Sequence, residues 1–374
     1  MRVLHCITSL DIGGAQIMLL RYLRATARQG GNEHAVVSLA PVGALGEALG
    51  DCGVRVLSLG QSRGRPSLAA LVALTRMLRA ERPDIVHGWM YHANLASMLA
   101  SALGPRVPVI WGVHHSLRDI AAEPPLTRIV IRAGARLSRR AAAITYCSRA
   151  SAAQHERISY DPSKRAVLPN GIDTDEFRPR PGAAERLRAM LGVPGGRLLI
   201  GSVARDHPMK APEVLVRAVA DILSRGHDVQ AVFVGEGQTS GRAARAAREL
   251  GVADRVSLLD ARSDVPDVVA GFDIFALSSA WGEAFSLAVG EAMASGVPAV
   301  VTDLGDCAWL VGDAGGVAQP GDAASLADAL ESMIELGPEG RAALGARARS
   351  RIKERFSLER YRDRLDGLLA QVAA

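Results

Sequence analysis

The strongest constraint on the fold is an alternation of short β-rich runs and helical runs that continues along the chain and restarts near its middle. Predicted strands such as residues 2–10 and 84–90 precede predicted helices such as 17–30 and 93–104. After "AVLPNGIDTDEFRPRPG" the order begins again, with a strand at 197–205 and a helix at 212–226. This alternation predicts α/β architecture with parallel sheets and crossover helices. Two doubly wound sheets would place an active site beyond the carboxyl ends of the strands, in a cleft between domains.

The chain has 374 residues, which is long for one core and suits two domains. The Pro- and Gly-rich segment from Pro169 to Gly182 is the predicted connector. We therefore expect an N-terminal domain over residues 1–178 and a C-terminal domain over residues 179–356. The final segment, 357–374, has apolar residues at helical spacing and is expected to pack back toward the N-terminal domain as a helix: Leu358, Tyr361, Leu365 and Leu368.

Composition excludes several classes of protein. Hydrophobic residues at 48% and charged residues at 22% are typical of a soluble globular chain. The opening segment lacks the pattern of a secretory signal, and no apolar run approaches the roughly 18 residues that a membrane span needs. The cysteines are scattered, without the spacing of a disulfide framework or a zinc site: Cys6, Cys52, Cys147 and Cys307. A cytoplasmic location is expected.

Positive charge is concentrated in one part of the sequence. The net charge is +5, and between Arg118 and Arg165 ten basic residues stand against four acidic ones. Four arginines repeat every four positions and predict one basic stripe on a helix: Arg128, Arg132, Arg136 and Arg140. A solvated helix face and a peripheral contact with anionic membrane are both open interpretations. Nucleic acid is disfavoured, because aromatic residues are only 4% of the chain and no stacking platform accompanies the charge.

Two segments indicate anion binding. In "DIGGAQ", Gly13 and Gly14 separate a strand from a helix, so the backbone can approach a ligand at a helix N-terminus. A tight turn is the alternative. In "GSVARDHPMKAPEVL", Arg205 ends a strand and Lys210 precedes Pro212, a favoured first helical residue. A cation there opposes the helix dipole at a cost of ~0.3 to 1 kcal/mol, so we favour a phosphate clamp over solvated surface charges.

The segment "VFVGEGQTSG" imitates a dinucleotide fingerprint imperfectly. Gly235 and Gly237 match, but Ser240 occupies the third glycine position, and Asp260 follows Gly235 by twenty-five residues. A strand-to-helix turn beside a nucleotide is therefore preferred to a hydride-transfer site, and no cofactor is expected. The carboxylates of Asp173 and Asp175 follow an Asn-Gly pair and are interpreted as turn formers, with no bound metal.

Histidines and a tryptophan end two predicted strands of the N-terminal half. His114 and His115 close "VIWGVHHS", and "HGWMYHAN" contains His87, Trp89 and His92. Imidazole at a cleft suits proton transfer or polar contacts with a sugar near neutral pH. Local backbone capping or structural packing is the alternative for each of these residues.

The stretch "SSAWGEAFSLAVGEAMASGVPAVVTD" places Glu283 and Glu291 in a run that otherwise predicts a buried helix, from about residue 284 to 295. An ionised Glu291 in that core is costly unless it is paired or bonded to ligand hydroxyls, and a buried salt bridge with an arginine is the alternative. Glu283 precedes the helix, where it could cap free amides. The amides around residues 285–287 could instead bind a diphosphate.

Taken together and in this order, the motifs resemble those of the retaining GT-B glycosyltransferases of family 4 (glycosyl transferases group 1), over nearly the whole chain. The resemblance rests on the two glutamates with "ASGVP" and "AVVTD", on "LPNGIDTDEF", on "DIGGAQ", and on "GSVAR" with Lys210. It implies two Rossmann-like domains facing a central cleft. It also implies transfer of a hexosyl or N-acetylhexosaminyl group, with retention, from a UDP- or GDP-linked sugar to a hydroxyl acceptor, in cell-surface polysaccharide or glycolipid synthesis.

The resemblance also implies roles for individual residues. Arg205 and Lys210 would neutralise the diphosphate, Glu283 would contact the transferred sugar and Glu291 the ribose. Further donor contacts would come from the two glycine turns, the residue bordering the base and the phosphate-facing amides: Gly13, Gly14, Gly235, Arg262, Phe285, Ser286 and Leu287. His114 would lie near the reacting sugar. The residues on the acceptor side, for a glycan or lipid-linked acceptor, would be His87, Trp89, His92 and His115.

Three positions depart from the family pattern: Gln16, Ala211 and Ala284 stand where glutamate, glycine and glycine are usual. These changes are small and leave the identity of the sugar open. Two other functions remain as alternatives, a non-hydrolysing UDP-sugar epimerase of similar two-domain shape and a non-enzymatic protein that binds sugar nucleotides.

Overall fold

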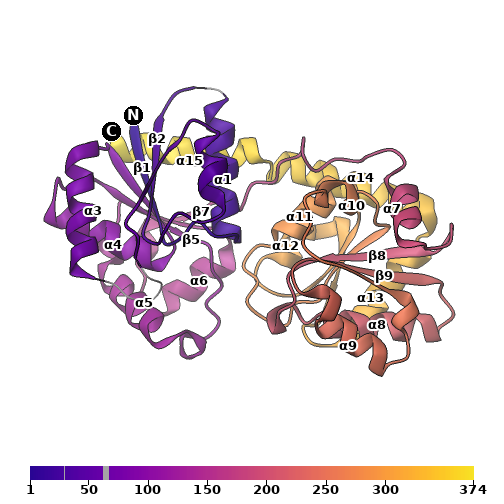
Figure 1. Cartoon of the computed structure of the whole chain (residues 1–374). Helices are drawn as coiled ribbons and strands as arrows, with labels where there is room; N and C mark the ends of the chain where they lie inside the picture. Colours follow the sequence, from indigo (N-terminus) through magenta and orange to yellow (C-terminus); the bar gives the residue numbers. More distant parts are fainter. Residues whose placement is uncertain (29, 62–66) are drawn as a thin grey trace. The chain divides into compact units, whose positions relative to one another are not determined.

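The computed structural model describes residues 1–28, 30–61 and 67–374, which form two compact units (Figure 1). The N-terminal unit comprises Met1–Gly171 with Leu358–Ala374, and the C-terminal unit comprises Ile172–Ser357. The division falls earlier than the boundary expected after residue 178. Ile172 is fully buried in the C-terminal core, and its N–H donates to the Phe356 carbonyl at 2.8 Å. The turn at Asp173 therefore belongs to the C-terminal unit.

All paired strands of the N-terminal sheet run parallel, in the order β3-β2-β1-β4-β5-β6-β7 among the described residues. The order reverses at β1, the first strand of the chain. The strands are β1 (Arg2–Ile7), β2 (Glu33–Ser38), β3 (Arg55–Ser58), β4 (Ile85–Trp89), β5 (Val109–Val113), β6 (Ala143–Tyr146) and β7 (Arg165–Val167).

Helices connect these strands, as the alternation predicts. The helices are α1 (Gly14–Ala27), α2 (Leu45–Gly50), α3 (Leu68–Glu81), α4 (Tyr91–Leu103), α5 (Pro125–Leu137) and α6 (Arg149–Arg157). Short 3-10 helices accompany them: η1 (Ile120–Ala122), η2 (Ser138–Arg140) and η3 (Pro162–Lys164). Helix α1 ends at Ala27 rather than at the expected Gly30, and Gln29 lies outside the described residues.

The last helix, α15 (Leu358–Ala373), packs on the N-terminal unit beside α1 (Figure 1). Leu365 and Leu369 on this helix are fully buried. The buried Tyr22 hydroxyl of α1 donates to Asp366 of α15 at 2.6 Å. The apolar face and this hydrogen bond hold α15 on the N-terminal unit, although α15 is the last helix of the sequence.

The C-terminal sheet is also parallel, in the order β10-β9-β8-β11-β12-β13. Its strands are β8 (Leu198–Val203), β9 (Val229–Val234), β10 (Val256–Leu259), β11 (Ile274–Leu277), β12 (Ala299–Thr302) and β13 (Gly315–Ala318). The helices are α7 (Ala183–Leu191), α8 (Pro212–Ser224), α9 (Arg242–Glu249), α10 (Val265–Val269), α11 (Leu287–Ala294), α12 (Cys307–Val311), α13 (Ala323–Glu335) and α14 (Gly337–Arg355). Short 3-10 helices are η4 (Pro208–Lys210), η5 (Gln238–Ser240), η6 (Ala253–Arg255) and η7 (Gly312–Ala314).

Both faces of the C-terminal sheet are covered, which explains its nearly continuous apolar strands. Successive side chains of a strand point to opposite faces, so in β11 Phe275 and Leu277 enter one core cluster and Ile274 and Ala276 the other. Helix α11 lies in the first cluster, where Val289 and Met293 are fully buried. The prediction of a core helix in the segment after β11 is confirmed.

Helix α11 begins at Leu287, later than the predicted start near residue 284. The backbone before it is held by another contact, since the Ala284 carbonyl accepts the Asp306 N–H at 2.9 Å. Gly305 has φ +57°, and a Cβ there would lie 2.3 Å from the Glu283 carbonyl oxygen. The segment after β12 therefore packs directly against the backbone of residues 283 and 284 and keeps that backbone out of the helix.

A row of aromatic side chains crosses the core of the N-terminal sheet. His5 of β1 lies beside His87 of β4, and the two residues are 0% and 1% exposed. The Trp89 indole donates to His5 Nδ1 at 3.2 Å, so His5 Nε2 carries the proton toward His34 Nδ1, 3.1 Å away. Burial lowers the pKa of His87 to about 3 and that of His34 to about 4. These imidazoles are therefore neutral in the folded protein.

This burial makes stability depend on pH. Below the ordinary pKa of 6.5 the unfolded chain binds protons that folded His87 does not accept, so the free energy of unfolding should fall as pH drops from 6.5 toward 3. The slope approaches about 1.4 kcal/mol per pH unit for each such histidine. Denaturant unfolding at pH 7.5 and 4.5 should show this loss, and the loss should be about 3 kcal/mol smaller in His87→Leu. An equal loss in the wild type and the variant would contradict this account.

Candidate functional site

The principal candidate site lies at the carboxyl ends of β8 and β11. These strands are neighbours where the strand order of the C-terminal sheet reverses: β9 and β10 follow on one side, and β11 to β13 on the other. Lys210 lies in the segment after β8, and Glu283 in the segment after β11. Ligands of doubly wound sheets bind beyond the strand ends at such a reversal. The structure thus brings two predicted site residues, seventy-three positions apart, to the expected place.

Hydrogen bonds tie these two segments together. The Ser278 hydroxyl donates to the Lys210 carbonyl at 2.9 Å, and the Ala280 N–H donates to the Met209 carbonyl at 2.8 Å. Gly282 has φ +80°, and a Cβ at this position would lie 2.3 Å from Met209 Sδ. A glycine is therefore required where the segment after β11 crosses the segment after β8.

Glu283 and Lys210 form an ion pair in the site. Lys210 Nζ donates to Glu283 Oε1, and the fully buried Ser279 hydroxyl donates to the same oxygen at 2.7 Å. The Glu283 side chain is 7% exposed and the Lys210 side chain 21%. A cation and a hydroxyl therefore offset the burial of this carboxylate. The anion that the sequence predicts near Lys210 is, in this structure, a side chain of the protein itself.

Ser286, the N-cap residue of α11, makes no side-chain cap, and the Glu283 carboxylate accepts hydrogen bonds from the Lys210 and Ser279 side chains. The predicted phosphate-facing segment instead has mixed exposure. Phe285 and Ser286 are 6% and 4% exposed, and the Phe285 ring packs 5.5 Å from the ring of Phe356. Leu287 is half-buried. Glu291 lies in the second turn of α11 and is 9% exposed.

Cations gather around His207 on the segment after β8. Arg205 is exposed, and with Arg242 and Lys210 it places positive charge near this imidazole. Burial and then the field of Arg205 lower the pKa of His207, whose Nδ1 accepts the Met209 N–H at 3.2 Å. The surroundings therefore favour an anion over a further cation. Neither His207 nor Arg242 was predicted, although His207 lies between the predicted Arg205 and Lys210 in the sequence.

Gly235 and Arg262, two predicted donor contacts, have structural partners. Gly235 has φ +145°, and a Cβ there would lie 2.2 Å from the Ala204 carbonyl oxygen. This glycine lets the turn after β9 pass against the segment that carries Arg205. Arg262, after β10, donates through Nε and one terminal nitrogen to Asp264. Its guanidinium is therefore held within its own turn.

Asp173 acts as the predicted turn former. Its Oδ1 accepts the backbone N–H groups of Asp175 and Glu176 at 3.0 and 2.9 Å. Within the described residues, no group of three or more histidine, cysteine, aspartate or glutamate side chains is arranged to hold a metal ion.

His114 lies at the end of β5 in the N-terminal unit. It stacks on Trp89 with ring centroids 5.0 Å apart and planes inclined by 12°, and its Nδ1 lies 3.1 Å from Asn170 Oδ1. Because an amide oxygen only accepts, Nδ1 donates and Nε2 keeps its lone pair. Burial lowers the pKa of His114 to about 4. The imidazole thus presents a neutral hydrogen-bond acceptor, and Asn170, from "LPNGID", fixes its tautomer.

The other predicted residues of this unit differ in their surroundings. His115 Nε2 lies 2.7 Å from Glu123 Oε1, so His115 has a carboxylate partner, whereas the partner of His114 is the amide of Asn170. His87 and Trp89 are buried within the core rather than displayed at the strand end, so they support His114 instead of forming a surface. His92 is half-buried and lines an apolar cavity.

The predicted glycine turn after β1 is held by hydrogen bonds among its own residues. Gly13 is the N-cap residue of α1, in an extended conformation, and its carbonyl accepts the Ile17 N–H at 2.9 Å. A Cβ at Gly13 would lie 2.6 Å from Gln16 Oε1, whereas a Cβ at Gly14 would have no atom within 4 Å. The Gln16 amide donates to the Ser9 carbonyl at 3.3 Å. Open space therefore lies over Gly14, and the departure at Gln16 has a structural role.

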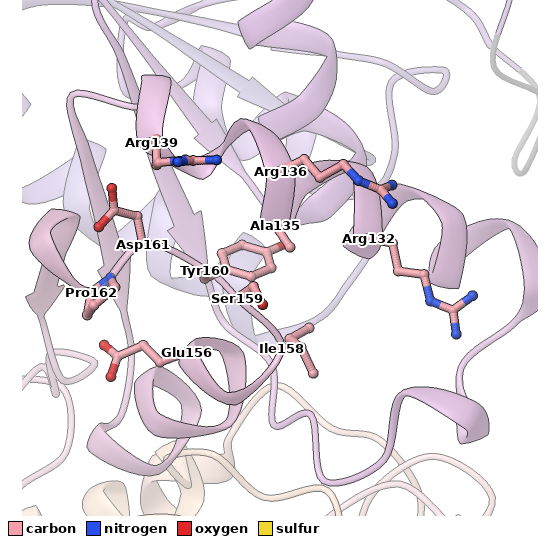
Figure 2. Close-up of a pocket in the computed structure, with 10 residues that line it drawn as sticks. All are labelled: Arg132, Ala135, Arg136, Arg139, Glu156, Ile158, Ser159, Tyr160, Asp161 and Pro162. Atoms are coloured by element: carbon pink, nitrogen blue, oxygen red, sulfur yellow. The ribbon is translucent and has the colours of Figure 1, made fainter.

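The basic stripe is confirmed in part. Arg128, Arg132 and Arg136 lie on α5, but Arg140 belongs to η2, where the change of helical pitch takes it off the stripe. Figure 2 shows Arg132 and Arg136 extending to the same side, beside a hollow of about 570 Å³ that Glu156 and Asp161 also line. Among the described residues, these two arginines form no salt bridge, and no helix is long and apolar enough to cross a membrane.

Comparisons with known proteins agree with this geometry. Residues 12–176 match the family described as Glycosyltransferase Family 4, and residues 184–351 match Glycosyl transferases group 1. A D-inositol 3-phosphate glycosyltransferase of Rhodococcus erythropolis is 34% identical over 224 residues, which cover 57% of this chain and 50% of that protein. A putative glycosyltransferase of Bacillus subtilis, EpsF, is 34% identical over 137 residues, covering 37% of this chain and 35% of that protein. The matched regions thus span half or less of these curated relatives.

A solved structure is similar over its whole length. The Anabaena protein HepE, solved in complex with UDP, superposes with a TM-score of 0.87 at 23% identity, covering 99% of this chain and 100% of HepE. The fold is therefore that of a GT-B glycosyltransferase, with two Rossmann-like units. The two family matches follow one another along nearly the whole sequence, and the chain belongs to the family 4 glycosyltransferases, glycosyl transferases group 1.

Proposed function

We propose that this protein transfers a sugar from a nucleotide diphospho-sugar to a hydroxyl group of an acceptor, with retention of the anomeric configuration. The observation that carries the proposal is the Lys210–Glu283 ion pair, at the strand reversal of the C-terminal sheet and beside Arg205 and Arg242. The names of the relatives support sugar transfer, and HepE has been solved with UDP and with UDP-glucose. A UDP-linked sugar is accordingly the first donor to test.

The ion pair suggests how the donor would bind. A diphosphate would replace the Glu283 carboxylate as the partner of Lys210, and Arg205 would add a second cation. Both would stabilise the negative charge that develops on the leaving nucleoside diphosphate. Glu283, released from Lys210 but still held by Ser279, could then accept hydrogen bonds from sugar hydroxyls. One interaction in the free protein would thus be exchanged for two with the donor.

The remaining roles follow from the family resemblance. Glu291 would accept hydrogen bonds from the ribose, and the amides of Phe285 to Leu287 would face the phosphates. The neutral Nε2 of His114 suits acceptance of a hydrogen bond from a hydroxyl of the transferred sugar. The leaving phosphate would take the acceptor proton on the face from which it departs, so no protein nucleophile is required.

The acceptor is proposed to be a glycan or a lipid-linked sugar used in cell-surface polysaccharide or glycolipid synthesis. The exposed arginines of α5 support a peripheral position at the inner face of the cell membrane, because they lack acidic partners within the described part of the chain. The proposed location is the cytoplasm with reversible membrane contact.

Activity is tested directly with a panel of UDP- and GDP-linked sugars, following release of the nucleoside diphosphate with and without lipid-linked acceptors. The wild type should process at least one donor. Arg205→Ala and Lys210→Ala should each lower kcat/KM by about 10² to 10³-fold, because each removes positive charge from the transition state. Lys353→Ala, an exposed site on α14, is the control. A folded wild type that processes no donor would contradict the proposal.

Ser279 is expected to position Glu283. Ser279→Ala should lower kcat/KM for the nucleotide sugar about tenfold, since one hydrogen bond to a charged group is lost, while binding of UDP alone stays unchanged. Ser97→Ala, which removes another fully buried hydroxyl in the N-terminal unit, serves as the matched control. A parallel loss of UDP binding would show that Ser279 supports the fold of the site rather than the orientation of Glu283.

Membrane contact is tested by sedimentation with liposomes. Vesicles containing anionic lipid should bind the wild type, and Arg132→Gln/Arg136→Gln should lower the bound fraction several-fold at low salt, because about 1 kcal/mol of attraction is lost with each charge. Arg24→Gln/Arg28→Gln is the control, since these exposed arginines have the same four-residue spacing, with Arg24 in the last turn of α1 and Arg28 as its C-cap. Equal binding of the two double variants would defeat this part of the proposal.

A further inference from the structure

A hollow of about 580 Å³ in the N-terminal unit lies at the amino ends of β5, β6 and β7. Its walls are the last turns of α4 and the segments that lead into these three strands. The strands pair in parallel, so their carboxyl ends, with His114 after β5, lie at the opposite edge of the sheet. The five residues of β5 separate the two edges by roughly 13 Å. The hollow is therefore distinct from the site to which His114 belongs.

Positive charge is gathered around this basic hollow. Among its described lining residues none is acidic, and the cationic ones are Arg106, Arg139, Arg140 and Lys164. Within the described part of the chain, these four side chains form no salt bridge and no hydrogen bond. Asp161 lies near Arg139 and Lys164, but it lines the hollow shown in Figure 2. The four cations repel one another, and a bound anion would remove that repulsion.

Hydroxyl groups hold the segments that carry these cations. The Ser101 hydroxyl donates to the Val107 carbonyl at 2.6 Å and ties the end of α4 to the segment before β5. The fully buried Ser138 hydroxyl accepts the Asp161 N–H at 2.9 Å and ties η3 to η2. Arg140, which lies off the basic stripe of α5, is one of the cations placed in this way. The backbone of the basic hollow is therefore arranged without a ligand.

Arg106 has a backbone conformation that favours glycine. Its φ is +57°, in the left-handed region, where an L side chain is strained. Glycine at this position would relieve the strain, yet the residue is an arginine. Strained residues of this kind are concentrated at ligand sites, because the use of the side chain offsets the strain. The conformation of Arg106 therefore favours a binding role for its guanidinium.

Neutralisation of the C-terminal carbonyl groups of α4 is the alternative role for these cations. Those carbonyl groups have other donors, however. The Leu103 carbonyl accepts a hydrogen bond from the Arg79 guanidinium at 3.0 Å. The Ser101 carbonyl accepts the N–H groups of Gly104 and Arg106 at 3.2 and 3.0 Å. The cationic side chains of the basic hollow are thus not required to end the helix.

We infer that the basic hollow binds a small soluble phosphate compound that carries several negative charges. Its volume lies in the range of small-molecule sites, and arginine matches the geometry of phosphate oxygens. Met98 and Val109 add apolar surface for an organic group attached to the phosphates. A concave site encloses a compact anion, whereas a membrane surface is nearly flat. This inference does not depend on the proposed function, because the donor would bind in the C-terminal unit.

Calorimetric titration with inorganic tripolyphosphate tests the inference. Arg205→Ala/Lys210→Ala, which removes cations from the candidate donor site, should retain one binding event per chain. Adding Arg140→Gln/Lys164→Gln should weaken that event roughly tenfold, because two charge-assisted contacts are lost. Adding Arg132→Gln/Arg136→Gln instead is the matched control, since it removes the same charge from the hollow that Glu156 and Asp161 line. Equal weakening by the two pairs would show general attraction to positive charge and overturn the inference.

Arg106→Gly separates binding from stability. Glycine adopts φ +57° without strain, so the denaturant midpoint should be unchanged or higher while the affinity for tripolyphosphate falls about fivefold. Arg82→Gly is the control, because Arg82 is also an exposed arginine with positive φ, at +46°, and does not line the basic hollow. Its affinity should equal that of the wild type. Wild-type affinity in folded Arg106→Gly would overturn the inference.

Sedimentation with vesicles distinguishes a soluble phosphate compound from a lipid headgroup. Vesicles of phosphatidylcholine with phosphatidic acid should not displace tripolyphosphate, and Arg140→Gln/Lys164→Gln should sediment with them as much as the wild type does. Displacement of tripolyphosphate by the vesicles, with loss of vesicle binding in this variant, would assign the four cations to a membrane surface. That result would overturn the inference.

Discussion

The candidate site depends on one constraint, the burial of the Glu283 carboxylate at the end of a core strand. A carboxylate that is 7% exposed needs a counter-charge and hydrogen bonds, and it obtains them from Lys210 and Ser279. That requirement brings the segments after β8 and β11 into contact, which in turn requires glycine at Gly282. Gly305 admits the next segment against the Glu283 backbone. The burial of this carboxylate therefore explains why Ser279, Gly282 and Gly305 occupy their positions.

The pair also explains how a preformed site can exist before its ligand arrives. Arg205, Arg242 and Lys210 place positive charge at the strand ends, and Glu283 balances part of it. A diphosphate carries more charge than one carboxylate and can be met by several of these cations. Exchange of partners at Lys210 would then couple donor binding to release of Glu283 toward the sugar. In the N-terminal unit, His114 is likewise prepared in a neutral form by burial and by Asn170.

Sequence reasoning predicted the fold well because parallel sheets leave a strong local signal, with apolar strands separated by helices. It predicted the candidate residues Lys210 and Glu283 but not their contact, since side chains seventy-three positions apart are joined only by the strand order. The start of α11 was predicted too early because the Asp306 contact that holds the preceding backbone is also non-local. His87 and Trp89 were assigned to the acceptor side with structural packing as the alternative, and the sequence of β4 alone does not reveal which of its side chains are buried. Ser279 and Arg242 carried no local motif, whereas Gly282 and Gly305 could have been suspected as glycines close to strand ends.

The exchange of partners at Lys210 is the central claim, and titration of UDP into three proteins tests it most directly. UDP has no sugar for Glu283 to bind, so Glu283→Gln should free Lys210 and bind UDP more tightly than the wild type does, although sugar transfer falls. Lys210→Met should bind UDP more weakly than the wild type. Weaker UDP binding by Glu283→Gln, with the fold intact, would contradict the claim, because it would show that the carboxylate supports the phosphate site instead of competing for its cation.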